Sequence, residues 1–141
     1  MIASIHPPCY RGEKDKKSIM SAYFHAMEHP HIHIIGHPDD GRFEVDYEAL
    51  VKKAKETGTL LEVNNGSLRP GGFRLNTREN DLEMLKYCKK YEVPVTMGSD
   101  AHIDVDLAEY PYAMEVIRES GFPEELIVNT ALSKLEKILA I

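Results

Sequence analysis

Short apolar runs alternate along the chain with longer amphipathic segments. Short runs bounded by turn-forming residues are typical of buried strands. They predict strands at residues 2–5, 32–35, 60–64, 95–98 and 126–128. The amphipathic segments predict helices at about residues 16–28, 46–56, 76–91, 107–120 and 132–139. This alternation predicts five βα units.

Two of the expected helices carry end signals of their own. Gly58 follows the second helix and suits a left-handed C-cap. Asn76, with Glu79 three residues later, resembles a helix start with capping chemistry.

Parallel strands joined by crossover helices are compatible with two α/β fold classes, an open doubly wound sheet and a piece of a βα barrel. The pattern alone does not separate them. Barrel enzymes gather chemical groups after successive strands, whereas an open sheet places its ligand at one crevice. The metal-binding residue types of this chain follow successive strands, and this favours the barrel.

Histidine and aspartate residues follow three of the expected strands. His6 follows the first strand, His37 follows the second, and Asp100 and His102 follow the fourth. Because parallel strands point their C-terminal ends the same way, these side chains should converge on one rim. Imidazole nitrogen and carboxylate oxygen suit zinc, manganese or iron. A single such residue is more often a hydrogen-bonded or surface group, but four that converge predict a metal site.

Polar residues after the third strand offer groups that could hold a phosphate. Asn64, Asn65, Ser67 and Arg69 combine neutral donors with one guanidinium. Arginine binds phosphate through a planar fork, and serine or asparagine can donate to the remaining oxygens. A polar turn that only closes the loop explains the same residues equally well.

Three alternating histidines, His29, His31 and His33, precede or begin the second expected strand. This places them on the opposite rim from His37, so we interpret them as structural or surface residues. A second metal site there is the less favoured alternative, because alternating histidines on one strand face can chelate.

Composition limits the class of partner. The 141 residues are 43% hydrophobic and 28% charged, which is ordinary for one globular unit. No apolar run approaches the length that spans a bilayer, and the first residues lack signal-peptide features, so we expect a cytoplasmic protein without a membrane partner. The net charge of -6 disfavours nucleic acid as a partner.

Four short motifs resemble those of the polymerase and histidinol phosphatase (PHP) superfamily. They are Ser4-Ile5-His6-Pro7, Ile35-Gly36-His37-Pro38, Glu62-Val63-Asn64-Asn65-Gly66-Ser67 and Gly98-Ser99-Asp100-Ala101-His102. Their order and spacing are also similar, and the resemblance covers nearly the whole chain. It is closest to the phosphatase branch typified by YcdX-type proteins, and the last motif is the most specific.

The resemblance implies a distorted seven-stranded (β/α) barrel whose C-terminal rim holds two or three metal ions, commonly zinc, manganese or iron. It implies metal-dependent hydrolysis of small phosphate monoesters. His6 and His37 would share one metal, Asp100 would bind a second, and His102 would belong to a third.

The start of the sequence departs from the family pattern. A complete PHP domain carries a His-x-His pair, a further histidine and a bridging glutamate before the position that His6 matches. This chain begins five residues before His6. We therefore expect residues 1–141 to be a partial PHP domain that lacks its N-terminal βα units, binds metal weakly and is inactive by itself.

A partial barrel also bears on the oligomeric state. Five strands cannot close a barrel of seven, and the exposed strand edge predicts a homo-oligomer.

The alternative to an enzyme is a non-catalytic PHP-like module that binds a metal or a phosphate.

Overall fold

Four parallel strands form the centre of the structure, a computed structural model that describes residues 1–139. Their order is β1-β2-β3-β4, and every neighbouring pair is parallel. The strands are β1 (Ile2–Ala3), β2 (Ile34–Ile35), β3 (Leu60–Asn64) and β4 (Val95–Gly98). The chain therefore has an α/β fold with a parallel sheet, and the sheet is open within the described residues because β1 and β4 are its outer strands.

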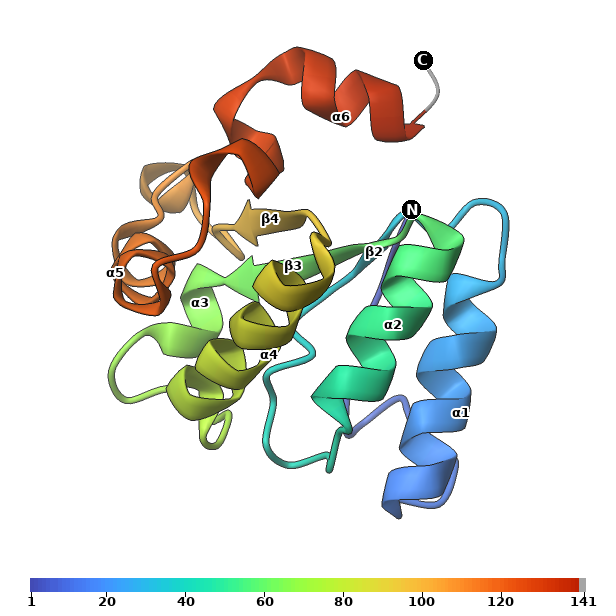
Figure 1. The fold of residues 1–141 in the computed structure, drawn as a ribbon. Helices are drawn as coiled ribbons and strands as arrows, with labels where there is room; N and C mark the ends of the chain where they lie inside the picture. Colours follow the sequence, from blue (N-terminus) through green and yellow to red (C-terminus); the bar gives the residue numbers. More distant parts are fainter. Residues whose placement is uncertain (140–141) are drawn as a thin grey trace.

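Helices connect the strands and cover the sheet. Figure 1 shows α1, α2 and α4 side by side over one face, with α5 beside α4 and α6 above the sheet. The α-helices are α1 (Lys16–Met27), α2 (Tyr47–Thr57), α3 (Asn65–Leu68), α4 (Thr77–Tyr91), α5 (Pro111–Ser120) and α6 (Leu132–Leu139). Single 3-10 turns are η1 (Asp104–Asp106), η2 (Glu124–Leu126) and η3 (Val128–Thr130).

The helix ends show how the sequence sets these boundaries. The Asp46 carboxylate accepts a hydrogen bond from the Ala49 N–H at the start of α2, and Gly58 ends that helix at φ 72°. The prediction for Gly58 is thereby confirmed. Asn76 does precede α4, but it has a left-handed backbone and makes no capping hydrogen bond through its side chain, so the expected capping chemistry is wrong.

The core lies between the sheet and its helices. All five residues of β3 are buried, and Leu50 and Val51 of α2 and Leu85 of α4 pack in the same hydrophobic cluster. β3 lies between β2 and β4, and its alternate residues Glu62 and Asn64 are buried as well. Two polar side chains thus enter the interior just below the C-terminal end of the sheet.

The fifth strand expected at 126–128 does not form. That segment forms η2 and η3 and makes one isolated parallel bridge, from Ile127 to Val95. The side chain of Asn129 occupies the adjacent edge of β4: its Oδ1 accepts from the Met97 N–H at 2.7 Å, and its Nδ2 donates to the Met97 carbonyl at 3.0 Å. An amide side chain thereby satisfies the groups that a fifth strand would have paired.

Other boundaries also differ from the sequence pattern: β1 ends at Ala3 rather than at residue 5, and β2 begins at Ile34 rather than at residue 32. The helix expected from 107 begins at Pro111, where proline suits the first helical position. A short helix, α3, occupies residues expected to form a loop, and the Asn64 side chain accepts from the Ser67 N–H at its start.

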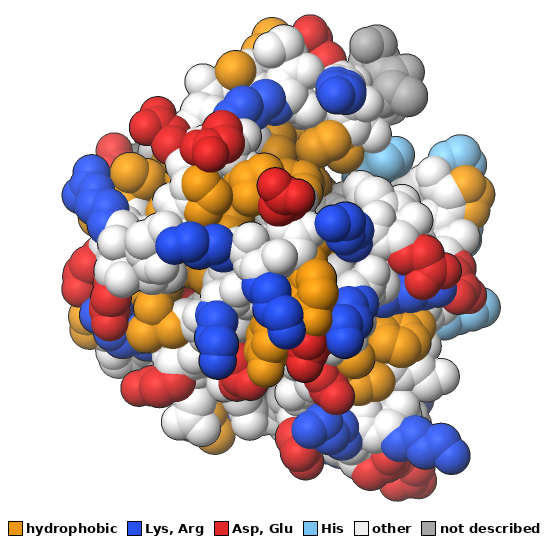
Figure 2. Space-filling view, viewed as in Figure 1, with side chains coloured by type: hydrophobic (Ala, Val, Ile, Leu, Met, Phe, Trp, Pro, Cys, Tyr) orange, Lys and Arg blue, Asp and Glu red, His pale blue; other side chains and the backbone are white. Residues whose placement is uncertain are grey.

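The surface of the helical face carries mixed charge. Figure 2 shows lysine and arginine side chains over α2 and α4, interspersed with acidic ones, and hydrophobic side chains exposed beneath α6. Within residues 1–139, none of the helices is both long and apolar enough to cross a membrane.

Candidate functional site

The candidate residues converge at the C-terminal end of the sheet. In Figure 1 the arrowheads of β3 and β4 point toward the side where α3 lies. His6, Arg69, Asp100 and His102 line one cavity of about 460 Å³ at this rim, although they come from three different loops. Parallel topology therefore brings together residues that are far apart in sequence, as the sequence pattern predicts.

His6 and His37 are in direct contact at this rim. Their Nε2 atoms are 3.2 Å apart, and the two rings meet edge to face. His37 is 5% exposed, and its Nδ1 is buried without a hydrogen-bond partner. Burial lowers the pKa of His37 to about 4, and the nearby Arg74 and His6 act in the same direction.

This pair fits a shared metal ion. Two nitrogen donors on one tetrahedral zinc lie about 3.3 Å apart when each Zn–N distance is about 2.0–2.1 Å. The observed 3.2 Å matches that separation, and a neutral imidazole is the form that binds a metal. Among residues 1–139, no three His, Cys, Asp or Glu side chains are grouped to hold one ion.

A buried glutamate supports the loop that carries His37. Glu62 Oε2 accepts the His37 backbone N–H at 2.8 Å and the Asn64 Nδ2 at 3.1 Å. Burial raises the pKa of Glu62, while these two donors partly offset the increase. Gly98 of β4 makes room for this carboxylate, since a Cβ at Gly98 would lie 1.8 Å from Glu62 Oε1.

Asp100 and His102 take up a second part of the rim. The His102 Nδ1 donates to the Asp100 carbonyl at 2.8 Å, because a carbonyl can only accept. That bond leaves the His102 Nε2 with a free lone pair, the arrangement in which histidines bind metals. His37 and Asp100 both have positive φ, at 35° and 55°, which is uncommon outside glycine and more frequent at functional sites.

Arg74 joins the parts of this rim. Its side chain is only 7% exposed, and its Nη1 donates to Ser67 Oγ at 2.8 Å, to Asp100 Oδ2 at 3.2 Å and to Asn64 Oδ1 at 3.3 Å. One guanidinium thereby connects the loops after β3 and β4, and it also lines the cavity.

The four residues expected to hold a phosphate lie in three different settings. Arg69 lines the cavity and pairs with Asp106 at 3.0 Å. Asn64 and Ser67 are buried beneath the rim and contact Arg74. Asn65 points away from the cavity, where its Oδ1 accepts from the backbone N–H groups of Tyr112 and Ala113 and thereby caps α5.

The chain is similar to longer bacterial proteins. It is 40% identical over 144 residues to a protein from Caldicellulosiruptor saccharolyticus, covering 100% of this chain and 57% of the relative. It is 36% identical over 140 residues to a Clostridium botulinum protein (99% and 56% covered) and 33% identical over 139 residues to a Thermoanaerobacter protein (99% and 56%). All three relatives are named probable phosphatases.

The similarity covers only part of each relative. The chain spans about half of their length, so the comparison covers part of each relative. No protein-family model matches the chain.

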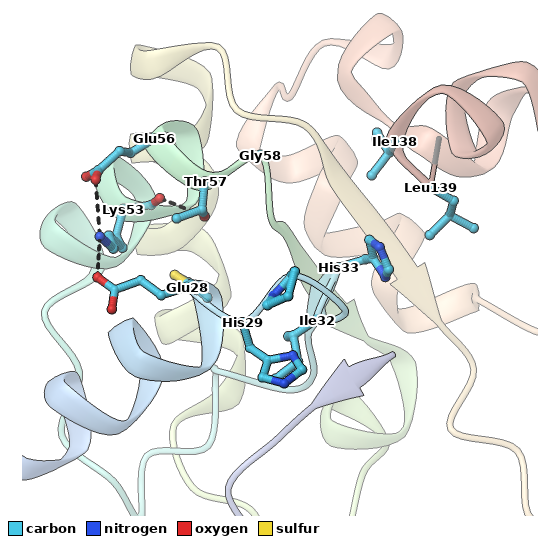
Figure 3. A pocket seen from close by; sticks show the side chains of 12 residues that line it. Glu28, His29, Ile32, His33, Lys53, Glu56, Thr57, Gly58, Ile138 and Leu139 are labelled. Atoms are coloured by element: carbon cyan, nitrogen blue, oxygen red, sulfur yellow. Dashed lines mark hydrogen bonds and ion pairs between the residues drawn. The ribbon is translucent and has the colours of Figure 1, made fainter. Parts of the chain in front are cut away.

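The alternating histidines lie at the other end of the sheet, as the sequence predicts. Figure 3 shows His29 and His33 beside a pocket in which Lys53 bridges Glu28 and Glu56, at 2.9 and 3.2 Å. His29 Nδ1 accepts from the His31 N–H at 3.3 Å, and His33 Nδ1 contacts the N-terminal amine at 3.0 Å. The nearby carboxylates are therefore paired with lysine rather than with imidazole.

Sequence reasoning missed Arg74 and did not assign a role to Glu62. Arg74 follows the Pro70-Gly71-Gly72 turn without any local pattern that marks it. Glu62 carried a usable signal, because an acidic residue inside a fully buried strand requires a partner.

Proposed function

We propose that this chain forms part of a metal-dependent phosphatase of the PHP superfamily that hydrolyses small phosphate monoesters. The observation that carries the proposal is the 3.2 Å approach of the His6 and His37 Nε2 atoms at a rim that also bears two cavity-lining guanidinium groups. The proposal is supported by the similarity of the chain, along nearly its whole length, to about half of each of two proteins named probable phosphatases.

Each rim residue has a proposed role. His6 and His37 would hold one metal ion, Asp100 a second and His102 a third, with further ligands from elsewhere in a protein of the relatives' length. A bound metal would supply a nucleophile from water and would neutralise phosphoryl charge. In such a protein the strands would close into the (β/α) barrel that the family resemblance implies.

The guanidinium groups of Arg69 and Arg74 would bind phosphate oxygens. Arg74 is held at the cavity wall by Ser67 and Asn64, and Arg69 is held by Asp106. A fixed guanidinium gives its hydrogen bonds without first losing side-chain freedom, so the phosphate would be oriented on arrival. Charge that spreads over the phosphoryl oxygens during transfer would be stabilised by the same groups.

The test is phosphate release from a panel of monoesters by the full-length protein with added zinc, manganese or iron. We expect turnover, and we expect His102→Ala to lower kcat/KM at least about a hundredfold with a loss of bound metal. His31→Ala is the matched control, because His31 is an exposed histidine at the opposite end of the sheet, and it should leave turnover and metal content near wild type. No turnover with any of the three metals would exclude the proposal.

A non-catalytic binding module is the second candidate. It is favoured by the absence, among residues 1–139, of any three-ligand group and by the pairing of Asp100 with Arg74. Binding of inorganic phosphate by the full-length protein without turnover of any monoester would select this candidate.

A further inference from the structure

Exposed hydrophobic side chains are concentrated in the two loops that line the candidate site. Among residues 1–139, five large and exposed apolar side chains lie in two loops, at 69–76 and 99–110, and the other three lie elsewhere. The five are Phe73, Leu75, Ile103, Val105 and Leu107. Clustered apolar exposure around a polar site marks a place where a ligand or a partner binds.

The two loops are joined across the cavity. Arg69 pairs with Asp106 at 3.0 Å, and Arg74 pairs with Asp100 at 3.2 Å, so a cation of the first loop contacts an anion of the second at two places. Phe73 and Ile103, one from each loop, line the same cavity as His6 and His102. The cavity therefore has an apolar part adjoining a polar part in which two arginines are paired with two aspartates.

The Phe73 ring is exposed but held in position. It is 71% exposed, and the guanidinium groups of Arg42 and Arg74 lie 4.9 and 5.5 Å from its centroid. Such cation–π contacts orient the ring while leaving part of its surface free. Arg74 thus contacts both the aromatic ring and the polar residues of the rim.

We propose that the site accepts phosphate monoesters whose alcohol part carries an apolar ring. This inference rests on the proposed phosphatase function. The phosphate would bind at Arg69 and Arg74, and the ring would lie against Phe73 and Ile103. A cavity of about 460 Å³ is within the range that holds a small molecule of this kind. The planar donor groups of the two guanidiniums would select the phosphate end, and the apolar surface would select the other end.

The experiment compares benzyl phosphate with glycerol 3-phosphate on the full-length, metal-loaded protein. Both esters release a primary alcohol, so their intrinsic reactivity is similar and their organic parts differ. We expect kcat/KM to favour benzyl phosphate by about tenfold or more, since ring contacts in an apolar pocket give discrimination of this order. Phe73→Ala should remove most of this preference by lowering kcat/KM for benzyl phosphate alone, and Phe73→Tyr should keep it.

Leu132→Ala supplies the matched control, because Leu132 is 72% exposed and lies on α6, away from the cavity lining. It should leave the preference unchanged. Equal turnover of the two esters, or turnover of neither while another monoester of the panel is hydrolysed, would overturn the inference while the proposed function stands. No turnover of any monoester would overturn both. A Phe73→Ala variant that melts several degrees lower and affects both esters alike would show that the ring packs against protein, which also overturns it.

Discussion

Replacing Gly98 by alanine should damage both the stability of the chain and the geometry of its rim. Gly98 is the last residue of β4 and pairs with Asn64 of β3. An added Cβ would lie 1.8 Å from Glu62 Oε1 and 2.7 Å from Glu62 Cδ, so the carboxylate must move. Glu62 is 8% exposed and sits in a packed strand, which leaves little room for that movement.

The magnitude has two sources. Overpacking a buried position costs about 1–3 kcal/mol. Displacement of the carboxylate also removes the acceptor of the His37 N–H and of the Asn64 Nδ2, and a buried donor left without a partner costs about 1–3 kcal/mol. Partial relaxation reduces the sum, so we expect the free energy of unfolding to fall by about 2–5 kcal/mol, a large part of typical domain stability.

Urea unfolding followed by circular dichroism measures this change. Gly12→Ala is the control, because its Cβ would meet only the movable Tyr10 side chain, and it should stay within about 0.5 kcal/mol of wild type. The Glu62→Ala background provides a double-mutant cycle: without the carboxylate, Gly98→Ala should cost much less. A Gly98→Ala cost that is small in both backgrounds would refute the packing of Glu62 against β4.

Two other features lead to predictions. Asp81 is fully buried on α4 without a hydrogen-bond partner, and burial, with Asp39 and Glu62 nearby, raises its pKa above the ordinary 3.8. The favourable contribution of Asp81 to the free energy of unfolding is present below about pH 4 and is lost as pH rises through its folded pKa. The free energy of unfolding of Asp81→Asn, relative to that of wild type, should therefore increase between pH 4 and 7 by on the order of 1 kcal/mol or more. Exposed Glu83→Gln on the same helix should show no such trend in urea titrations, and a flat difference for Asp81→Asn would contradict the assignment. Sedimentation of the chain should reveal self-association, because β1 is an outer strand with Met1 and Ile2 exposed at 65% and 62%, whereas a monomer at high concentration would reject this expectation.

The fold was predictable where local patterns coincide with tertiary contacts. Short apolar runs marked the four strands, and Gly58 marked the end of α2 correctly because its left-handed backbone is a local requirement. The fifth strand failed because the side chain of Asn129 satisfies the edge of β4, and nothing in the apolar run at 126–128 reveals this tertiary contact.

Part of the candidate site was also predictable from the sequence. His6 and His37 could be brought together from topology alone, because each follows a strand of one parallel sheet. Arg74 could not, since its position depends on how the loop from Arg69 to Asn76 folds back over Ser67. Phosphate binding was expected from Asn64, Asn65, Ser67 and Arg69, and two of these side chains, Asn64 and Asn65, cap the helices α3 and α5.

The contacts made by Glu62 and Arg74 also hold the strained backbone of two candidate ligands. His37 and Asp100 hold positive φ angles, and such conformations cost of order 1–3 kcal/mol each in residues other than glycine. Each is fixed by a group from another strand or loop: Glu62 accepts the His37 N–H, and Arg74 pairs with the Asp100 carboxylate. These contacts offset the strain only while both loops keep their positions. A rim built this way would hold the candidate ligands in place before any ion or substrate arrives, which is the condition under which a site of few ligands can bind with defined geometry.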